Sequence, residues 1–595
     1  MQNNNKNILL ATVLSFIILL SWTWFIEKPR IEKQEAQNRI LAAQKTKEET
    51  TKTVIKQNSS TPKNLENKGL ATSDKIVSKP NENISSLKTS GEIIAETRKN
   101  RVTIESENLH GSIYLKGARF DDLTLAKYFE KSDHKNEVSL FSPSESKFRY
   151  FADFGWIASS STLDLPKPDS LWKSSGEKLT PKNPITLSWK NKNNIEFIIQ
   201  IALDENYMFS VTQAVKNNSK SAISIAAYGR INRVLNSVQK PVYILHEGAI
   251  GVFSDVLQES TYKDLLKEKY QEFQAQNGGW FGITDKYWLS SILPDRNLKY
   301  SASFSSELNN QNNFFNAEFI GQEFEIAAGE ELKFNHHLFA GAKKVDLLDQ
   351  YAKEFDAKLF DRAVDFGWFY FLTKPFFFII EFLSKFLGNF GLAILAMTVI
   401  IKLLLFPMAN KSYAAIAKVK KLQPKVDDLR QRFKDDRLAL NREIMELYKR
   451  EKVNPASGCL PILIQIPVFF SLYKVLYVTL DMRQAPFYGW IKDLSAPDPT
   501  SIFNLFGLLP FEVSSSFTIG IWPILMGVTM IIQQKLNPTS SDPTQAKILK
   551  WMPYVLTFVL AAFPAGLVIY WTWSNLLSIL QQFLITKKLN KSKNS

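Results

Sequence analysis

Strongly apolar blocks occur at both ends of the chain and alternate with polar stretches. The first block, Ile8–Ile26, has 19 apolar or small residues and no charge, so it is long enough to cross a bilayer core of about 30 Å. Lys6 precedes it, and no small-x-small cleavage pattern follows. The block therefore predicts an uncleaved signal anchor over residues 1–26, with a cleaved signal peptide as the alternative.

Five more apolar blocks lie near the C-terminus and predict membrane-spanning helices. They are Phe390–Met408, Leu460–Leu480, Ile519–Leu536, Leu549–Phe563 and Leu567–Ile585. With the anchor they predict six spans, five of them in a helical core over residues 389–589. Only Phe563–Gly566 separates the last two blocks, which predicts a tight turn between them.

The segment 361–388, just before these spans, is apolar but interrupted. Lys374, Glu381, Ser384 and Lys385 fall on a single polar stripe. The pattern predicts an amphipathic helix that lies in the membrane interface. A spanning helix is the alternative, but it would move the most basic loop outside, against the positive-inside tendency.

Between the two apolar regions the chain reads first as a tether and then as a β domain. Residues 27–99 contain no Phe, Trp or Tyr, which predicts a disordered tether. Residues 100–348 contain short alternating runs with turn signals, which predict a large β-sandwich. The runs are Arg101–Glu105, Leu109–Lys116, Asn194–Leu203, Tyr207–Val215, Ala222–Arg230, Pro241–Leu245 and Glu331–Ala340. His336 and His337 would point to opposite faces of the last strand.

The net charge of +15 is concentrated beside the apolar blocks. Residues 409–458 hold 13 Lys/Arg against 7 Asp/Glu, and the tail from Lys587 adds four lysines. Residues 409–458 also read as two helices, with Pro424 interrupting the first, and predict a helical hairpin. The positive-inside tendency places this hairpin, the basic tail 590–595 and both termini in the cytoplasm, and the β domain outside.

Polar residues within the predicted spans are the best candidates for a functional site. Lys402 has Thr398 one turn earlier, and Gln465 and Gln533 lie in other spans. The last span carries a polar stripe, which consists of Tyr570, Ser574, Ser578, Gln581 and Gln582. The alternatives are a snorkelling Lys402 and simple hydrogen bonding between helices. Lys474, near the end of its span, lacks such a group of polar neighbours. We interpret it as a snorkelling lysine, whose ammonium reaches the membrane surface.

The sequence gives no sign of cofactor or metal chemistry. The single cysteine, Cys459, begins an apolar run and predicts a small buried side chain. The five histidines have no metal-ligand spacing, and no nucleotide-binding motif is present. We expect neither cofactor nor metal, and no enzyme activity.

Several motifs resemble those of the YidC/Oxa/Alb family of membrane protein insertases. The motifs are KLQPK at Lys421–Lys425, LYKREKVNP at Leu447–Pro455, GCLPILIQIP at Gly458–Pro467, RQAPF at Arg483–Phe487, DLS at Asp493–Ser495 and FPAG at Phe563–Gly566. The resemblance covers about Asp361–Leu589. The anchor, tether and β domain further resemble the Gram-negative form of the family, whose outer domain is a β-supersandwich similar to sugar-mutarotase folds.

This resemblance implies an inner-membrane insertase that moves hydrophobic segments of nascent proteins from a hydrophilic groove, open to the cytoplasm, into the bilayer. With the polar stripe, it suggests a groove formed by Lys402, Thr398, Gln465, Gln533, Tyr570, Trp571, Ser574 and Gln581. Substrates would leave along Ile466 and Phe469. Lysines expected to contact cytoplasmic partners are Lys418, Lys420, Lys421, Lys587 and Lys588. Lys402 departs from the family's groove arginine, and Trp571 stands where a second tyrosine is common.

The implied partners are nascent membrane proteins, the Sec translocon, the ribosome, the targeting receptor and membrane lipids. Two other functions fit parts of the pattern. A polytopic transporter would also explain polar residues within spans, although no internal repeat is visible. A membrane-anchored periplasmic protein that acts on or binds carbohydrate would suit the β domain, although fold likeness alone does not establish activity.

Overall fold

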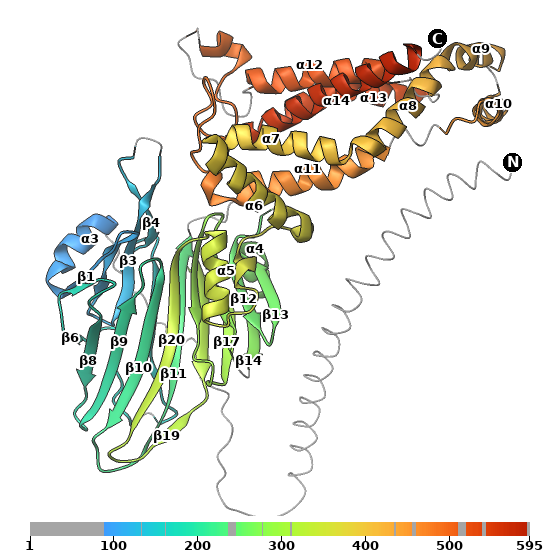
Figure 1. Cartoon of the computed structure of the whole chain (residues 1–595). Helices are drawn as coiled ribbons and strands as arrows, with labels where there is room; N and C mark the ends of the chain where they lie inside the picture. Colours follow the sequence, from blue (N-terminus) through green and yellow to red (C-terminus); the bar gives the residue numbers. More distant parts are fainter. Residues whose placement is uncertain are drawn as a thin grey trace, which may run out of the picture. The chain divides into compact units, whose positions relative to one another are not determined.

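The computed structural model describes residues 88–591, except 132–133, 161, 236–244, 276–277, 310–311, 434–435, 455–459, 508, 510–518 and 538–542 (Figure 1). The described residues fall into two compact units. One contains the described part of residues 412–459, and the other contains the β domain with the remaining helices. The predicted anchor, most of the predicted tether and Cys459 lie outside the described residues.

The β domain is a sandwich of two sheets, as the sequence predicted. Among the described residues, an eleven-stranded sheet runs through β14 (Tyr270–Ala275), β17 (Tyr300–Asn309), β18 (Asn312–Gly321), β11 (Ile223–Leu235), β5 (Tyr150–Ile157), β3 (Arg119–Phe129), β2 (Leu109–Tyr114), β1 (Arg101–Glu105) and β7 (Lys178–Leu179), with β19 (Phe324–Ile326) beside β11 and β4 (Glu137–Phe141) beside β3. A nine-stranded sheet runs through β13 (Val256–Thr261), β12 (Gly248–Phe253), β15 (Trp280–Thr284), β16 (Trp288–Leu293), β20 (Glu331–Ala342), β10 (Met208–Asn217), β9 (Ile195–Leu203), β8 (Ile185–Lys190) and β6 (Lys173–Ser174).

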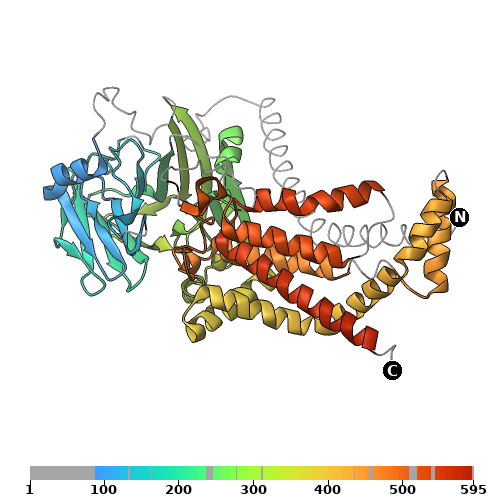
Figure 2. The same ribbon diagram turned by 90° about the horizontal axis from the view of Figure 1, so that it is seen from above.

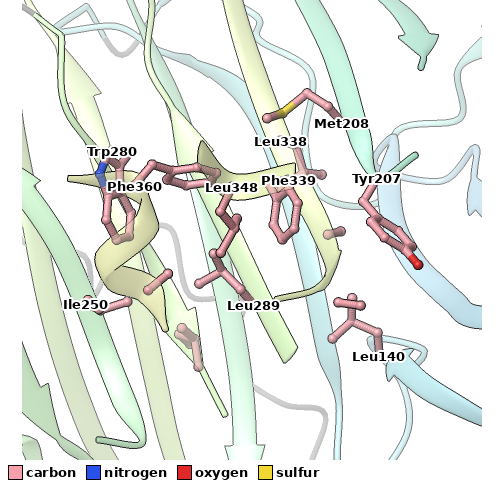
Figure 3. Packing of buried hydrophobic residues seen from close by; sticks show 14 of the residues in the cluster. Leu140, Tyr207, Met208, Ile250, Trp280, Leu289, Leu338, Phe339, Leu348 and Phe360 are labelled. Carbon is pink, nitrogen blue, oxygen red and sulfur yellow. The ribbon is translucent and has the colours of Figure 1, made fainter. Parts of the chain in front are cut away.

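Aromatic side chains fill the space between the sheets. Phe120 of the larger sheet packs edge to face on Phe209 of the smaller one, with ring centroids 5.3 Å apart. Trp280, Tyr207 and Phe339 are likewise buried in this cluster (Figure 3). Such rings bury a large apolar area, which is the main driving force for joining two sheets.

Six of the seven predicted strand runs match observed strands, and the seventh, Pro241–Leu245, lies almost entirely outside the described residues. The runs Asn194–Leu203 and Tyr207–Val215 form a hairpin, because β9 and β10 pair antiparallel with Phe209 opposite Leu203. On β20, His336 is fully buried and His337 is only partly buried, as alternation along a strand requires.

The C-terminal end of the predicted tether is folded. Ser90–Thr97 form helix α3, and the 3₁₀ helix η4 (Arg98–Asn100) connects it to β1. Thr89 and Glu92 make a reciprocal capping box at the start of α3, and Ile93 is buried. A capping box stabilises the start of a helix and needs no aromatic residues. The absence of aromatic residues was therefore a poor guide to where the tether ends, and the predicted end at residue 99 is too late.

The β domain leads into the helices through α5 (Val345–Glu354) and residues 355–369, here called the connector, which include the 3₁₀ helix η5 (Phe360–Ala363). The short helix α4 (Tyr262–Glu268) lies earlier, between β13 and β14. The predicted amphipathic helix is α6 (Tyr370–Leu387), which begins nine residues later than expected.

The polar stripe of α6 is directed partly toward the protein. Lys374 Nζ lies 2.7 Å from Asp349 Oδ1 of α5 and 2.9 Å from Asp361 Oδ2 of the connector. Ser384 is buried, whereas Phe371, Phe382 and Phe386 are strongly exposed. The exposed face of this helix is therefore mostly apolar.

The helical core consists of α7 (Phe390–Leu404), α11 (Leu460–Val478), α12 (Ile521–Leu536), α13 (Pro543–Leu560) and α14 (Ala565–Lys591). Helices α7, α11 and α12 each contact α14 (Figures 1 and 2). The 3₁₀ helices η7 (Leu480–Met482) and η8 (Ile502–Gly507) lie between α11 and α12. The tight turn predicted at Phe563–Gly566 separates α13 from α14, as expected.

The first predicted span of the core, Phe390–Met408, is wrong at its C-terminal end. Helix α7 ends at Leu404, and α8 (Phe406–Lys421) begins after a bend of 70°. Pro407 has no N–H to continue the hydrogen-bond ladder of α7, but it is tolerated in the first turn of a new helix. By length and apolar composition, the bent pair α7–α8 satisfies the criteria for a membrane span and no single described helix does.

The basic segment forms three helices rather than two. After α8, the chain continues as α9 (Gln423–Arg432) and α10 (Arg437–Arg450). Pro424 marks the predicted interruption. Val426 of α9 packs on Ile444 and Leu447 of α10, and Lys425 Nζ lies 2.8 Å from Glu451 Oε1. The antiparallel hairpin is thus built from α9 and α10.

Candidate functional site

Lys402, on the last turn of α7, is a cation surrounded by side chains from two other helices. Its Nζ donates to Ser578 Oγ of α14 at 2.7 Å and, over a longer 3.4 Å, to Gln465 Oε1 of α11. The apolar residues of α7, such as Ile394 and Met397, pack in the core on the buried side of the same helix. That packing presents Lys402 to the space between α7, α11 and α14.

Gln465 joins these three helices through both ends of its amide. While Oε1 faces Lys402, Nε2 donates to Tyr570 OH at 2.7 Å and to Ser574 Oγ at 3.3 Å. Tyr570, Ser574 and Ser578 are buried. We call Lys402, Gln465, Tyr570, Ser574 and Ser578 the Lys402 cluster. Tyr570, Ser574 and Ser578 follow one another at four-residue steps on α14, so one face of that helix supplies three members of the cluster.

The hydrogen-bonding partners of Lys402 are neutral. Within the described part of the chain, no carboxylate lies within 4.0 Å of its ammonium. An ammonium has three donors, and the two contacts leave one N–H for another group. The cluster therefore offers a positive charge and a free donor to a ligand that carries acceptor oxygens.

The other predicted groove residues stand apart from these hydrogen bonds. Thr398 is buried, but its Oγ1 donates to Ile394 O of its own helix at 2.7 Å. Gln533 is half-buried, and no hydrogen bond joins it to the cluster in the described residues. Gln581 is buried, and its Nε2 has no partner in the same part of the chain. Trp571 instead packs edge to face on Phe469, with ring centroids 4.6 Å apart.

Some polar contacts were missed from the sequence. Ser578, noticed only as part of the polar stripe, is the nearest partner of Lys402, and its four-residue step from Ser574 was the available signal. On another face of α14, Asn575 Nδ2 donates to Thr529 Oγ1 of α12 at 3.1 Å. Both residues are buried, so this bond links α12 to α14 outside the Lys402 cluster.

The interpretation of Lys474 as a snorkelling residue is wrong. Its Nζ lies 2.8 Å from Asp365 Oδ2 of the connector. The partner is 109 residues away in the chain, so no local pattern pointed to it.

The predicted slide and contact residues are accessible where the structure describes them. The side chain of Ile466 is 45 % exposed, and Phe469 is partly buried beneath Trp571. Lys418, Lys420 and Lys421 are exposed in the last turn of α8, and Lys587 is exposed on α14. The side chain of Lys588 lies outside the described residues.

Comparison with known proteins identifies relatives over the whole chain. The family model of the 60Kd inner membrane protein matches residues 382–593, and that of the YidC periplasmic domain matches residues 101–379. The membrane protein insertase YidC of Rickettsia bellii (strain OSU 85-389) is 48 % identical over 597 residues, covering 99 % of this chain and 100 % of the relative. That of Rickettsia canadensis (strain McKiel) is 47 % identical over 588 residues, with the same coverage.

Among solved structures, the chain is similar to an active YidC insertase crystallised with its first transmembrane domain resolved. The identity is 16 %, the TM-score is 0.33, and the match covers 81 % of this chain and 92 % of that one.

Proposed function

This chain belongs to the YidC family of membrane protein insertases, and from that membership we propose that the Lys402 cluster lines the groove that receives the polar parts of its substrates. The protein is a membrane protein insertase of the inner membrane, and residues 101–379 are its periplasmic domain. The relatives favour insertion over both the transporter and the carbohydrate-binding alternatives.

The observation that carries this proposal is a positive charge with only neutral partners inside a helical bundle. A polar loop crossing hydrocarbon loses the hydrogen bonds that water supplied, at several kcal/mol for each unsatisfied group. A polar site within the bundle replaces some of those bonds and shortens the apolar crossing. The ammonium of Lys402 would also attract acidic loop residues, because a charge acts more strongly where water is excluded.

We propose that the apolar segment of the substrate leaves along Ile466 and Phe469 of α11. The exposed side chain of the next residue supports this exit, since Phe470 is 44 % exposed. Lipid tails are as apolar as such a surface, so an apolar substrate helix has nearly the same free energy in either environment.

The proposed topology has six spans, with the N-terminus and C-terminus in the cytoplasm. Helix α6 lies in the periplasmic interface of the inner membrane. Two features support it: the basic residues of 409–458 and of the C-terminal tail then lie inside, and α6 presents Phe371, Phe382 and Phe386 to its surroundings. In this topology the exposed lysines Lys418, Lys420 and Lys421 would contact the ribosome, the targeting receptor or anionic lipids. The Sec translocon is a further proposed partner.

Site-specific crosslinking tests the groove. A photoreactive residue replaces Thr398, Gln465 or Tyr570 in the full chain, and a ribosome-stalled nascent chain with one apolar segment is supplied. We expect crosslinks to the nascent chain from all three positions. Leu525, which is 43 % exposed on α12, is the matched control and should give little crosslinking. Equal yields from Leu525 and from the cluster, or none from the cluster, would contradict the proposal.

A further inference from the structure

Lys474 and Asp365 form a largely shielded ion pair at the C-terminal end of α11. The nitrogen and oxygen are 2.8 Å apart, and the two side chains are only 12 % and 20 % exposed. Lys474 lies four residues before the last residue of the helix, Val478. Because solvent screens a shielded pair less than a surface pair, this contact holds the helix end more firmly than an exposed salt bridge would.

The same carboxylate holds two further segments. Asp365 Oδ2 accepts the backbone N–H of His246 from the β domain at 3.0 Å, and Oδ1 accepts that of Gly367 from the connector at 3.0 Å. A single side chain thus links the β domain, the connector and α11. We call Asp365 with these three partners the Asp365 clamp.

Gly367 shows how closely the connector is fitted to Lys474. Its φ is +71°, a conformation that residues with a side chain rarely adopt, and a Cβ at this position would lie 2.8 Å from Lys474 Cε. The backbone conformation of the connector therefore favours glycine here, and a larger residue would also have to displace the end of the Lys474 side chain.

We propose that Asp365 is a positioning residue for insertion: by holding Lys474 it fixes the C-terminal half of α11, and so sets where Gln465 meets Lys402 and Tyr570. The inference rests on the function proposed for the Lys402 cluster. Gln465 lies nine residues before Lys474 on the same helix, about 14 Å away along its axis. Pro467 lies between them, inside the helix, and has no N–H for the helical ladder.

The position of α11 is measured with two spin labels on the full-length protein in lipid bilayers. Cys459 is the only cysteine, so Cys459→Ser gives a background without thiols. Labels are attached through Phe470→Cys on α11 and Leu580→Cys on α14, two exposed positions outside the Lys402 cluster. We expect Asp365→Asn and Lys474→Met each to broaden the distribution of label distances. The ratio of clamped to unclamped α11 should fall at least about ten-fold, as expected for losing one hydrogen bond between charged groups.

Conservative and control variants separate positioning from general damage. Lys474→Arg keeps the charge and should keep the narrow distribution. Lys474→Met changes only α11, so it remains informative if Asp365→Asn disturbs the β domain.

The control Asp255→Asn removes another ion pair of the connector, the exposed 2.7 Å contact of Asp255 with Lys358, and should leave the distribution of label distances unchanged. The double variant Asp365→Asn, Lys474→Met should broaden the distances by less than the sum of the single variants, because both remove the Lys474–Asp365 contact, although Asp365→Asn also alters the bonds from His246 and Gly367. An unchanged distribution in both single variants, or additive broadening in the double variant, overturns the clamp.

Insertion of a single-span substrate is then compared in the same variants. Lys474→Met should reduce insertion severalfold in the wild-type background, but cause no further loss in Gln465→Ala, because the group that α11 positions is already absent. A full additional loss in Gln465→Ala overturns the positioning role. If Gln465→Ala leaves insertion unchanged while Lys474→Met still broadens the distances, the proposed groove fails and the clamp remains only as a structural contact. If the distances are unchanged but Gln465→Ala impairs insertion, the groove stands and the clamp fails.

Discussion

The ammonium of Lys402 makes two hydrogen bonds to neutral oxygens and none to a carboxylate among the described residues. The same geometry suits two different roles, a general cation and a shape-specific ligand. These roles differ in what they require of position 402. A cation needs charge and reach, whereas a shape-specific ligand needs the compact ammonium that Ser578 and Gln465 surround.

We predict that Lys402 acts mainly through its charge. Lys402→Arg should retain insertion, because it keeps the charge with comparable reach. Lys402→Ala should impair substrates with acidic translocated loops more than neutral ones, and Lys402→Glu should be worst because it adds repulsion and a shielded carboxylate. The measurement is protease protection of two model substrates that differ by one loop aspartate. Equal losses for both substrates in Lys402→Ala, or a strong defect in Lys402→Arg, would refute the charge-based role.

A second residue-scale prediction concerns His336, in the core of the β domain. Burial lowers its pKa to about 3. Its Nδ1 accepts the N–H of Asp295 at 2.9 Å, and its Nε2 has no partner in the described residues. Between about pH 6.5 and pH 3, His336 therefore stays neutral in the folded state. In the unfolded state the same imidazole takes up a second proton and becomes charged. The contribution of His336 to the free energy of unfolding is fully present above pH 6.5. It should be lost as the pH falls below that value, by up to about 1.4 kcal/mol per pH unit.

Denaturant unfolding of the full chain in detergent, followed by its β-sheet signal, measures this slope. His336→Phe should flatten the pH dependence whatever its effect on stability at neutral pH. The neighbouring core change Phe334→Leu is the control, because it should lower stability equally at all pH values. An identical slope in the wild type and His336→Phe would show that other groups cause the acid sensitivity.

At the scale of elements, the sequence located most helices well, but not where a break depends on a single residue. The block Phe390–Met408 was apolar throughout, so hydropathy did not detect the bend between α7 and α8, although Pro407 offered a local signal. The polar stripe of α6 was recognised, but its partner Asp349 lies in another helix. Periodicity predicts which residues share a face, not what that face contacts.

The basic ends of the elements lead to a further prediction. Lys587, Lys588, Lys591 and Lys593 lie at or beyond the last turns of α14, where positive charge also favours the helix C-terminus. Replacing all four with glutamine should weaken co-sedimentation with ribosomes, most strongly at low salt, because exposed charges are screened as ionic strength rises. Replacing Lys263, Lys267, Lys269 and Lys299 of the β domain is the charge-matched control. Unchanged ribosome binding by the tail variant at every salt concentration would reject an electrostatic role for the tail.

At the scale of the whole molecule, the order of the domains could be predicted from the sequence, because each domain has its own pattern of apolar and polar residues. The β-sandwich and the run of helices followed from alternation and from apolar block length. The Lys402 cluster was predicted in outline, since Lys402, Gln465, Tyr570 and Ser574 do meet. Thr398 and Gln533 were predicted to join them but bond elsewhere or not at all in the described residues, because a position on the right face does not fix a rotamer. The contact of Lys474 with Asp365 needed the tertiary structure.

The route by which the chain leaves the β domain has a mechanical consequence. The last strand, β20, is an interior strand of its sheet, paired with β10 over Met208–Lys216 on one side and with β16 over Trp288–Leu293 on the other. Tension transmitted along the chain from α6 reaches the domain through β20. A load along an interior strand shears both ladders at once, whereas a load on an edge strand peels its bonds one by one. The domain is therefore attached through a strand that is hydrogen-bonded on both sides, so a pull on the chain from α6 must break both ladders together.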